Sequence, residues 1–301
     1  MKTVLQLLAA LFLSIAPSLP AWATETAEMM TSADLANFDH PPPDVRIHYG
    51  NDPLQFGDLR LPEGDGPHPV AVFIHGGCWL AEFDIAHSEK LTAALTRNGI
   101  ATWSLEYRRV GNPGGGWPGT FLDIGNGADH LRLIADEHNL DLERVITMGH
   151  SAGGHLAIWA AARGAIPANS EIAALNPIPV NGVLALAPAA ELQSLHEAEH
   201  CGHVVDELMG GSPDEQPDHY RWGNPAEISP GDLPQVLIIG KHDTVWAPAG
   251  LRYYDAAKAR GDTVEMIEAA ESGHFEMIDP DSTTWPLVLE SARVLLGSER
   301  R

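Results

Sequence analysis

The sequence of 301 residues contains only two cysteines, Cys78 and Cys201. Two are too few for the dense disulfide scaffold of a small secreted domain, and their spacing does not decide whether they pair with each other. No C-x-x-C pair or other familiar spacing of zinc ligands is present. The segment HEAEHCGH, residues 196–203, gathers three histidines and a cysteine. It leaves a zinc site open as an alternative, but we expect no metal ion in this protein.

Positively charged side chains are also scarce, because 18 Lys and Arg stand against 41 Asp and Glu, for a net charge of −23. A surface that binds nucleic acid must neutralise phosphates with Lys and Arg, and anionic membranes attract basic segments. We therefore expect neither nucleic acid nor an anionic membrane surface as a partner. The negative charge favours a soluble monomer, although the sequence alone leaves the oligomeric state open.

A long hydrophobic run is missing as well. The most apolar stretch follows Lys2 and reads VLQLLAALFLSIAPSLP, before the small-residue site AWA. It is too short and too interrupted by proline to span a bilayer comfortably, and its order of basic, apolar and small residues is typical of a secretory signal. We predict a signal peptide at residues 1–23 and export to the periplasm or the medium. Cleavage there removes one lysine and no acid, which changes the net charge to −24. An uncleaved membrane anchor is the alternative.

The rest of the chain alternates strand-like and helix-like segments. Two short alternating runs, VRIHYG and PLQFGDLRLP, predict an antiparallel hairpin. Strands follow at residues 70–75, 101–107, 144–149, 180–188, 234–240 and 263–269, with helices between them and after the last. This alternation predicts a mostly parallel, eight-stranded α/β sheet flanked by helices. We expect one domain over residues 24–301, with an irregular insertion at residues 188–222.

A serine stands between two glycines where a predicted strand turns directly into a helix, in the segment Gly149-His150-Ser151-Ala152-Gly153. Such a turn forces the serine into a strained backbone conformation, with a positive φ expected. Side chains two residues before and after it would collide with the neighbouring chain, which explains the two glycines. The hydroxyl of Ser151 then projects above the carboxyl edge of the sheet. The N–H of Ala152, at the helix start, is free to meet a developing negative charge.

A serine hydroxyl needs a base, and the base needs a partner that orients it. In a nucleophile elbow of this kind, the acid and then the histidine follow the serine at later strand ends. Asp243 lies just past the strand at 234–240, and His274 lies in the loop past the strand at 263–269. We predict these two residues as partners of Ser151. His242 is the main competitor for the role of base, but it precedes the last core strand.

The segment FIHGGCW, residues 73–79, ends the first long strand with two glycines, which allow backbone N–H groups to approach a ligand. Together with GHSAGGHLA, the Asp243 loop and GHFEMIDP, this segment makes the chain resemble the esterase/lipase branch of the α/β-hydrolases. The chain is similar to hormone-sensitive-lipase-like bacterial esterases, and nearer to the H-G-G-x-W subgroup of kynurenine formamidases and feruloyl or acetyl-xylan esterases.

The resemblance implies Ser151 as nucleophile, His274 as base, Asp243 as its partner, and a two-step acyl transfer without a cofactor. It also implies oxyanion donors at the backbone N–H groups of Gly77, Cys78 and Ala152. The chain departs from the family at two positions. Cys78 replaces the third glycine of many relatives, and His150 stands where hormone-sensitive-lipase relatives carry aspartate. The helical cap also looks reduced, to a short N-terminal piece and the insertion.

We expect a carboxylester hydrolase that acts on short-chain or aryl esters, including acyl groups on plant polysaccharide. Four aromatic side chains flank the catalytic loops and are candidates for the substrate pocket: Trp79, Trp117, Trp246 and Phe275. Three alternatives stay open at this point. They are an arylformamidase that cleaves an N-formyl amide, a prolyl-oligopeptidase-like peptidase, and a catalytically silent binding module on the same fold.

Overall fold

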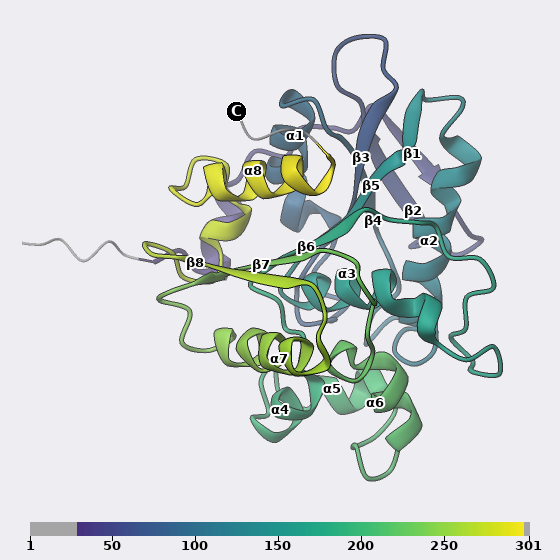
Figure 1. The fold of residues 1–301 in the computed structure, drawn as a ribbon, viewed down its shortest axis with the longest axis vertical. Helices are drawn as coiled ribbons and strands as arrows, with labels where there is room; N and C mark the ends of the chain where they lie inside the picture. Colours follow the sequence, from purple (N-terminus) through teal and green to yellow (C-terminus); the bar gives the residue numbers. More distant parts are fainter. Residues whose placement is uncertain (1–28, 298–301) are drawn as a thin grey trace, which may run out of the picture.

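The computed structural model describes residues 29–297, so the predicted signal peptide at 1–23 lies outside the described residues. Eight strands form one sheet in the order β1-β2-β4-β3-β5-β6-β7-β8 (Figure 1). Their bounds are β1 Val45–His48, β2 Phe56–Arg60, β3 His68–Ile74, β4 Ala101–Leu105, β5 Leu140–His150, β6 Gly182–Leu186, β7 Gln235–Gly240 and β8 Val264–Ala269. β2 is antiparallel to both β1 and β4, and all other pairs are parallel. The predicted fold class, an eight-stranded and mostly parallel α/β sheet, is confirmed.

Helices cover both faces of this sheet. The longer helices are α1 Glu89–Arg97, α2 Gly119–Ile134, α3 Ala152–Ala162, α7 Ala247–Arg260 and α8 Trp285–Leu295. In Figure 1, α1 and α8 lie on one side of the sheet, and α2, α3 and α7 lie on the other. Along β3 the buried side chains alternate between two hydrophobic layers, because successive residues of a strand point to opposite faces. Each layer is therefore a core between the sheet and one set of helices.

Shorter helices fill the connections. Five are short 3-10 helices: η1 Ser32–Asn37, η2 Ile85–Ser88, η3 Arg163–Ala165, η4 Pro225–Glu227 and η5 Glu276–Ile278. The predicted insertion after β6 contains three short helices, α4 Leu192–Glu197, α5 Val204–Met209 and α6 Pro217–Gly223, which gather beyond α7 in Figure 1. Helices of six or seven residues make fewer than two turns, so they leave little periodicity in the sequence. Within residues 29–297, no helix has the length and apolar character to cross a membrane.

Candidate active site

Ser151 lies between β5 and α3 with a φ of 57°. This value is in the left-handed region that residues other than glycine rarely adopt, and it confirms the expected positive φ. A Cβ atom at Gly149 would meet the carbonyl of Gly153, and one at Gly153 would meet the carbonyls of Ile74 and His75. Both positions therefore need glycine for the strand and helix to approach this closely. Ala152 is the first residue of α3, so its N–H has no acceptor within the helix.

Asp243 and His274 come together at the same edge of the sheet, in the loops after β7 and β8. Nδ1 of His274 donates to Oδ2 of Asp243 at 2.7 Å, and the backbone N–H of Trp246 donates to Oδ1 at 2.9 Å. Burial by itself raises the pKa of Asp243, but these hydrogen bonds outweigh it, and the pKa lies below its ordinary value. The carboxylate is therefore ionised at neutral pH and fixes the tautomer of His274 with Nε2 unprotonated. His242, the competing candidate, is exposed.

Ser151 and His274 face one pocket of about 260 Å³. Both side chains are mostly buried, with 5% and 8% of their surfaces exposed. The pocket is lined by Ser32, Leu35, Gly77, Cys78, Phe83, His87, His150, Ser151, Trp246, His274 and Phe275. Within residues 29–297, no hydrogen bond joins Oγ of Ser151 to the imidazole of His274. Such catalytic hydrogen bonds are often long without substrate and tighten in the complex.

Two further histidines, His150 and His87, support the loop that carries His274 through hydrogen bonds. Nε2 of His150 lies 2.9 Å from the carbonyl of His274, and Nδ1 of His150 lies 2.8 Å from Nε2 of His87. A carbonyl only accepts, so His150 donates from Nε2, and its Nδ1 accepts from His87. Burial, with the neighbouring imidazoles, holds the pKa of His150 well below its ordinary value and lowers that of His87 to about 3. Both rings are therefore neutral, and the hydrogen bond of His150 joins the elbow around Ser151 to the His274 loop.

The loop after β3 has an unusual backbone. Gly77, Cys78 and Trp79 have φ values of 106°, 52° and 55°, three consecutive residues in the left-handed region. Gly77 and Cys78 line the pocket beside Ser151, as expected of residues whose N–H groups serve an oxyanion. Cys78 forms a disulfide with Cys201, with 6.2 Å between their Cα atoms, which answers the pairing question that the sequence left open. The bond joins this loop to the insertion.

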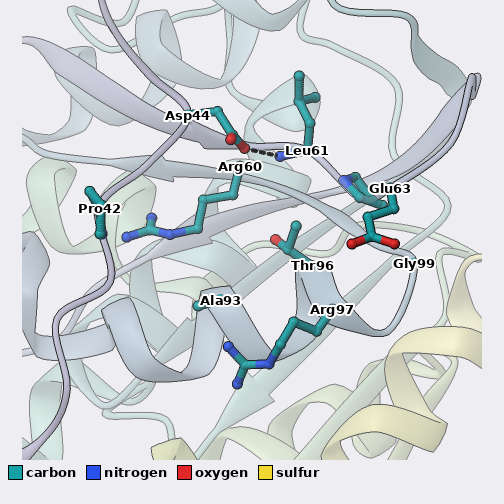
Figure 2. A pocket seen from close by; sticks show the side chains of 10 residues that line it. Pro42, Asp44, Arg60, Leu61, Glu63, Ala93, Thr96, Arg97 and Gly99 are labelled. Atoms are coloured by element: carbon teal, nitrogen blue, oxygen red, sulfur yellow. Dashed lines mark hydrogen bonds between the residues drawn. The ribbon is translucent and has the colours of Figure 1, made fainter.

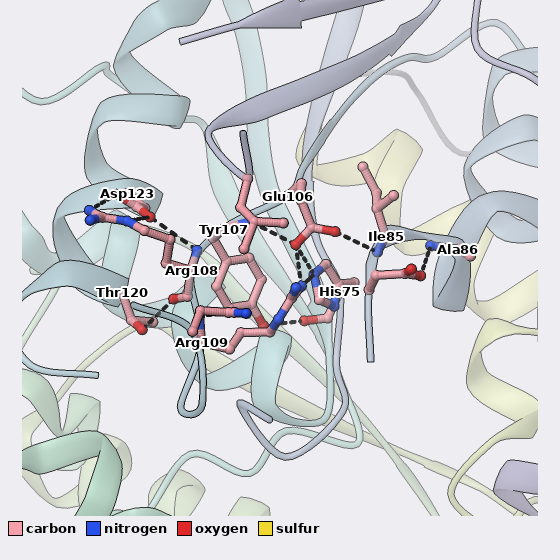
Figure 3. Close-up of polar contacts among 12 residues, drawn as sticks. His75, Ile85, Ala86, Glu106, Tyr107, Arg108, Arg109, Thr120 and Asp123 are labelled. Atoms are coloured by element: carbon pink, nitrogen blue, oxygen red, sulfur yellow. Dashed lines mark hydrogen bonds and ion pairs between the residues drawn. The ribbon is translucent and has the colours of Figure 1, made fainter. Parts of the chain in front are cut away.

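Buried charged groups hold the start of the same loop (Figure 3). Arg109 forms an ion pair with Glu106 and donates to Nε2 of His75 at 3.0 Å. Nδ1 of His75 donates to the carbonyl of Gly76 at 2.8 Å, and the hydroxyl of Tyr107 donates to the carbonyl of His75 at 2.9 Å. These residues come from the segments that directly follow β3 and β4. The peptide that leads into Gly76 and Gly77 is thus held by these buried side chains.

Two of the four predicted pocket aromatics lie where they were expected, and two do not. Trp246 and Phe275 line the pocket with Ser151. Trp79 has a positive φ and is instead fully buried, and its Nε1 donates to Nδ1 of His155 at 3.2 Å. Trp117 lines a separate depression with Trp222, and its Nε1 donates to Glu171 at 2.9 Å. The expectation that Trp79 and Trp117 form the pocket is therefore not met.

The structure also adds residues that the sequence did not indicate. Ser32 and Leu35 of η1 form one wall of the pocket, and Phe83 and His87 form another part. Glu276 fixes η1 against the His274 loop, because its carboxylate accepts from the N–H groups of Met30, at 2.6 Å, and Gly273, at 2.8 Å. The only local signal for η1 is the capping pattern that begins at Thr31. The resemblance implies a short N-terminal piece of the cap, but no pattern in the sequence indicates which of its residues reach the pocket.

A larger cavity, of about 590 Å³, lies at the opposite edge of the sheet, between the end of β2 and the end of α1 (Figure 2). Arg60, Arg97, Asp44 and Glu63 are among the residues that line it, and none of the predicted site residues does. For the part of the chain that the structure describes, no group of three or more His, Cys, Asp or Glu side chains is arranged to hold a metal ion. In the HEAEHCGH segment, the disulfide occupies Cys201, and His196 pairs with Asp206 at 2.6 Å.

Comparisons with known proteins show the family and the fold of the chain. The family model BD-FAE matches residues 58–249, which include Ser151 and Asp243. Esterase LipC of Mycobacterium tuberculosis is 26% identical over 245 residues, which are 78% of this chain and 60% of LipC. The chain therefore spans about three fifths of the length of that relative.

Two solved structures have the same fold. A truncated carbohydrate esterase from gut microbiota is 19% identical with a TM-score of 0.71, over 85% of this chain and 99% of its own. Esterase B from Lactobacillus rhamnosis (HN001) is 22% identical with a TM-score of 0.71, over 86% of this chain and 89% of its own. Because the family model covers most of the chain, the chain belongs to the BD-FAE family, and it has the α/β-hydrolase fold of these two esterase structures.

Proposed function

We propose that this protein is a serine carboxylesterase in which Ser151 is the nucleophile, His274 the general base and Asp243 its orienting partner. The observation that carries the proposal is the shared pocket. A strained serine at a helix start and a histidine held by a buried carboxylate both line it. Esterase LipC, a relative by sequence, supports the reaction class.

The reaction proceeds in two steps. Oγ of Ser151 attacks the ester carbonyl carbon while Nε2 of His274 takes the hydroxyl proton. The oxygen that becomes negative accepts from the N–H groups of Ala152, Gly77 and Cys78. The bond to the alcohol oxygen then breaks, and His274 passes its proton to the leaving alcohol. Water attacks the acyl-enzyme in the same way, its proton returns through His274 to Ser151, and the carboxylic acid leaves.

The substrates are short-chain or aryl esters. Ligand pockets commonly have volumes of roughly 300–1,000 Å³, and this one, at about 260 Å³, is small. Its lining is rich in apolar and aromatic side chains, among them Leu35, Phe83 and Phe275. Such a pocket accepts a short or flat acyl group and excludes a long chain. A saccharide hydroxyl as the alcohol, as in acylated plant polysaccharide, is supported by the description of one structural neighbour as a carbohydrate esterase.

Turnover of a substrate panel tests the proposal. The purified protein is assayed with p-nitrophenyl acetate to laurate, methyl ferulate, acetylated xylan and N-formylkynurenine. We expect the highest kcat/KM with acetate, butyrate or ferulate, and little turnover of the laurate or the formyl amide. The variant Ser151→Ala should lose all measurable turnover while it keeps its fold by circular dichroism. Equal activity of Ser151→Ala and wild type would refute the proposal, and preference for N-formylkynurenine would favour an arylformamidase.

We further propose that the protein is exported. The N-terminal pattern supports a signal peptide, and the Cys78–Cys201 disulfide is a feature of oxidising compartments. Mass spectrometry of the protein recovered from its native host should give a mature chain that begins near Thr24. A chain that retains residues 1–23 in the cytoplasm would contradict export.

A further inference from the structure

The turn that follows α4, residues 199–202, belongs to the HEAEHCGH segment whose role the sequence left open. Its backbone is tightly bent, with φ values of 50° at Glu199, 58° at Cys201 and 73° at Gly202. The turn lies in the insertion, outside the loops that carry the predicted triad. Two of its side chains nevertheless contact residues of the candidate active site. Cys201 contacts the loop of the proposed oxyanion donors, and His200 contacts the region of the proposed acid and base.

Cys201 reaches the oxyanion side through its disulfide with Cys78. Cys78 and Trp79 hold left-handed conformations that a residue with a side chain keeps only when its surroundings impose them. The indole of Trp79 is fixed by its bond to His155, and the N–H of Leu80 donates to the carbonyl of Gly77 at 2.9 Å. The disulfide adds the restraint that acts on Cys78 itself, whose N–H is one of the proposed oxyanion donors.

His200 reaches the side of the acid and the base. Its ring packs edge-on against the indole of Trp246, with 5.2 Å between the ring centroids. Between the ring centroids of Trp246 and His274 the distance is 5.5 Å, and the backbone N–H of Trp246 donates to Asp243. His200 thus packs against the residue that contacts both His274 and Asp243.

We propose that the turn at residues 199–202 supports catalysis by fixing two parts of the active site, with Cys201 and His200 as positioning residues. Cys201 holds the Cys78 peptide so that its N–H points at the oxyanion, and His200 holds Trp246 against Asp243 and His274. The proposal rests on the proposed esterase function. It explains why a cysteine stands where a third glycine would be the simpler choice, because the side chain at residue 78 is the point of attachment.

The effect of the disulfide is measured on kcat. Wild type is assayed with p-nitrophenyl butyrate before and after reduction by a phosphine, which converts the disulfide to two thiols, and beside the variant Cys201→Ser. We expect kcat to fall roughly 10- to 100-fold, since the loss of a whole oxyanion donor costs roughly 100- to 1,000-fold. KM should change by less than about twofold, because the donor acts mainly on the transition state. Affinity for a trifluoromethyl ketone, which forms the charged adduct, should fall in proportion to kcat.

A matched control separates reduction of this bond from other effects of the phosphine. The kcat of the double variant Cys78→Ser/Cys201→Ser should not change when the phosphine is added. Circular dichroism at the assay temperature should show the native fold in every sample. If the reduced wild type and Cys201→Ser keep kcat within about twofold while only the melting temperature falls, the disulfide is merely structural and this part of the proposal is wrong.

His200 is tested by a pair of substitutions. His200→Phe keeps an aromatic ring against Trp246 and should retain most of kcat, whereas His200→Ala should lower kcat several-fold. His203→Ala, at an exposed histidine just beyond the turn, is the control and should match wild type. Equal activity of His200→Ala and wild type, or of the Ala and Phe variants, would overturn the role of His200. Ester turnover and fluorophosphonate labelling of Ser151 in the oxidised wild type test the esterase proposal separately, and their absence would refute both.

Discussion

Asp243 is the residue on which the orientation of the base depends. It accepts from Nδ1 of His274 and from the N–H of Trp246. Replacement by asparagine keeps the size of the side chain, but it removes the charge and allows the amide N–H₂ to face the imidazole. His274 would then present the wrong tautomer to Ser151. We expect Asp243→Asn to lower kcat roughly 10⁴-fold in the p-nitrophenyl butyrate assay.

The control for this substitution lies in the same region. Glu271 is an exposed carboxylate in the loop that carries His274, and Glu271→Gln should leave kcat unchanged. Measurement of kcat for both variants, with folding checked by circular dichroism, decides the matter. A kcat for Asp243→Asn within tenfold of wild type would mean that another carboxylate orients the base.

Leu35 is the residue through which we expect the N-terminal segment to set substrate length. Its side chain lines the pocket opposite the catalytic loops and packs against the hydrophobic layer of α1 and α8. Truncation to alanine removes three carbons from the wall and makes room for a longer acyl chain. We expect Leu35→Ala to raise kcat/KM for the hexanoate and octanoate relative to the acetate by several-fold. Leu175→Ala, at a leucine that is 94% exposed, should leave this ratio unchanged, and an unchanged ratio in Leu35→Ala would place the acyl group elsewhere.

At the scale of elements, the loop after β3 depends on the ion pair between Glu106 and Arg109, each with only 2% of its side chain exposed. Glu106→Gln leaves the guanidinium buried without a counter-charge, and loss of one member of such a pair costs about 3–5 kcal/mol. Urea denaturation should show this loss in the free energy of unfolding. Asp141→Asn breaks the half-exposed pair of Asp141 with Arg144 and should cost less than about 1 kcal/mol. Equal losses in the two variants would show that the buried pair contributes no more than a surface pair.

The elements that the sequence predicted are those whose signal is local. The strands are short apolar or alternating runs bounded by glycine or proline, the long helices fill the longer segments between them, and the elbow around Ser151 needs only glycines within two residues of it. The wall formed by η1 could not be predicted in this way, because it depends on contacts such as that of Met30 with Glu276, 246 residues away in sequence. The inward turn of Trp79 was missed for a related reason. The indole of Trp79 donates to His155, 76 residues away in sequence, and such a contact leaves no local pattern.

At the scale of the whole molecule, the candidate site is assembled from segments that the fold brings to one edge of the sheet. Parallel strands end at the same edge, so the loops after β3, β5, β7 and β8 meet there. This common edge is why the order serine, acid, histidine was sufficient to predict which side chains come together. The N-terminal segment then forms part of the pocket wall, and the disulfide joins the insertion after β6 to the loop that carries Cys78.

The buried neutral histidines make the stability of the whole molecule depend on pH. His155 shows the cause clearly, because its Nδ1 accepts from Trp79 and its Nε2 donates to the carbonyl of Gly223 at 2.8 Å. A second proton would have to occupy the nitrogen that faces a donor. Burial lowers the pKa of His155 from 6.5 to about 4. Between these two values the unfolded chain binds a proton that the folded protein does not.

The sign of the effect follows from this difference in bound protons. The free energy of unfolding should fall as the pH falls from 6.5 to about 4, by about 1.4 kcal/mol per pH unit for His155 alone. Above pH 6.5, where the ring is neutral in both states, its contribution does not change. His155→Gln keeps an acceptor for Trp79 and a donor for Gly223 but does not titrate. Urea denaturation from pH 8 to pH 5 should therefore give a shallower loss for His155→Gln, by about 1.4 kcal/mol per pH unit, and parallel behaviour above pH 7. Identical slopes below pH 6.5 would show that the folded protein takes up a proton at His155 as readily as the unfolded chain does.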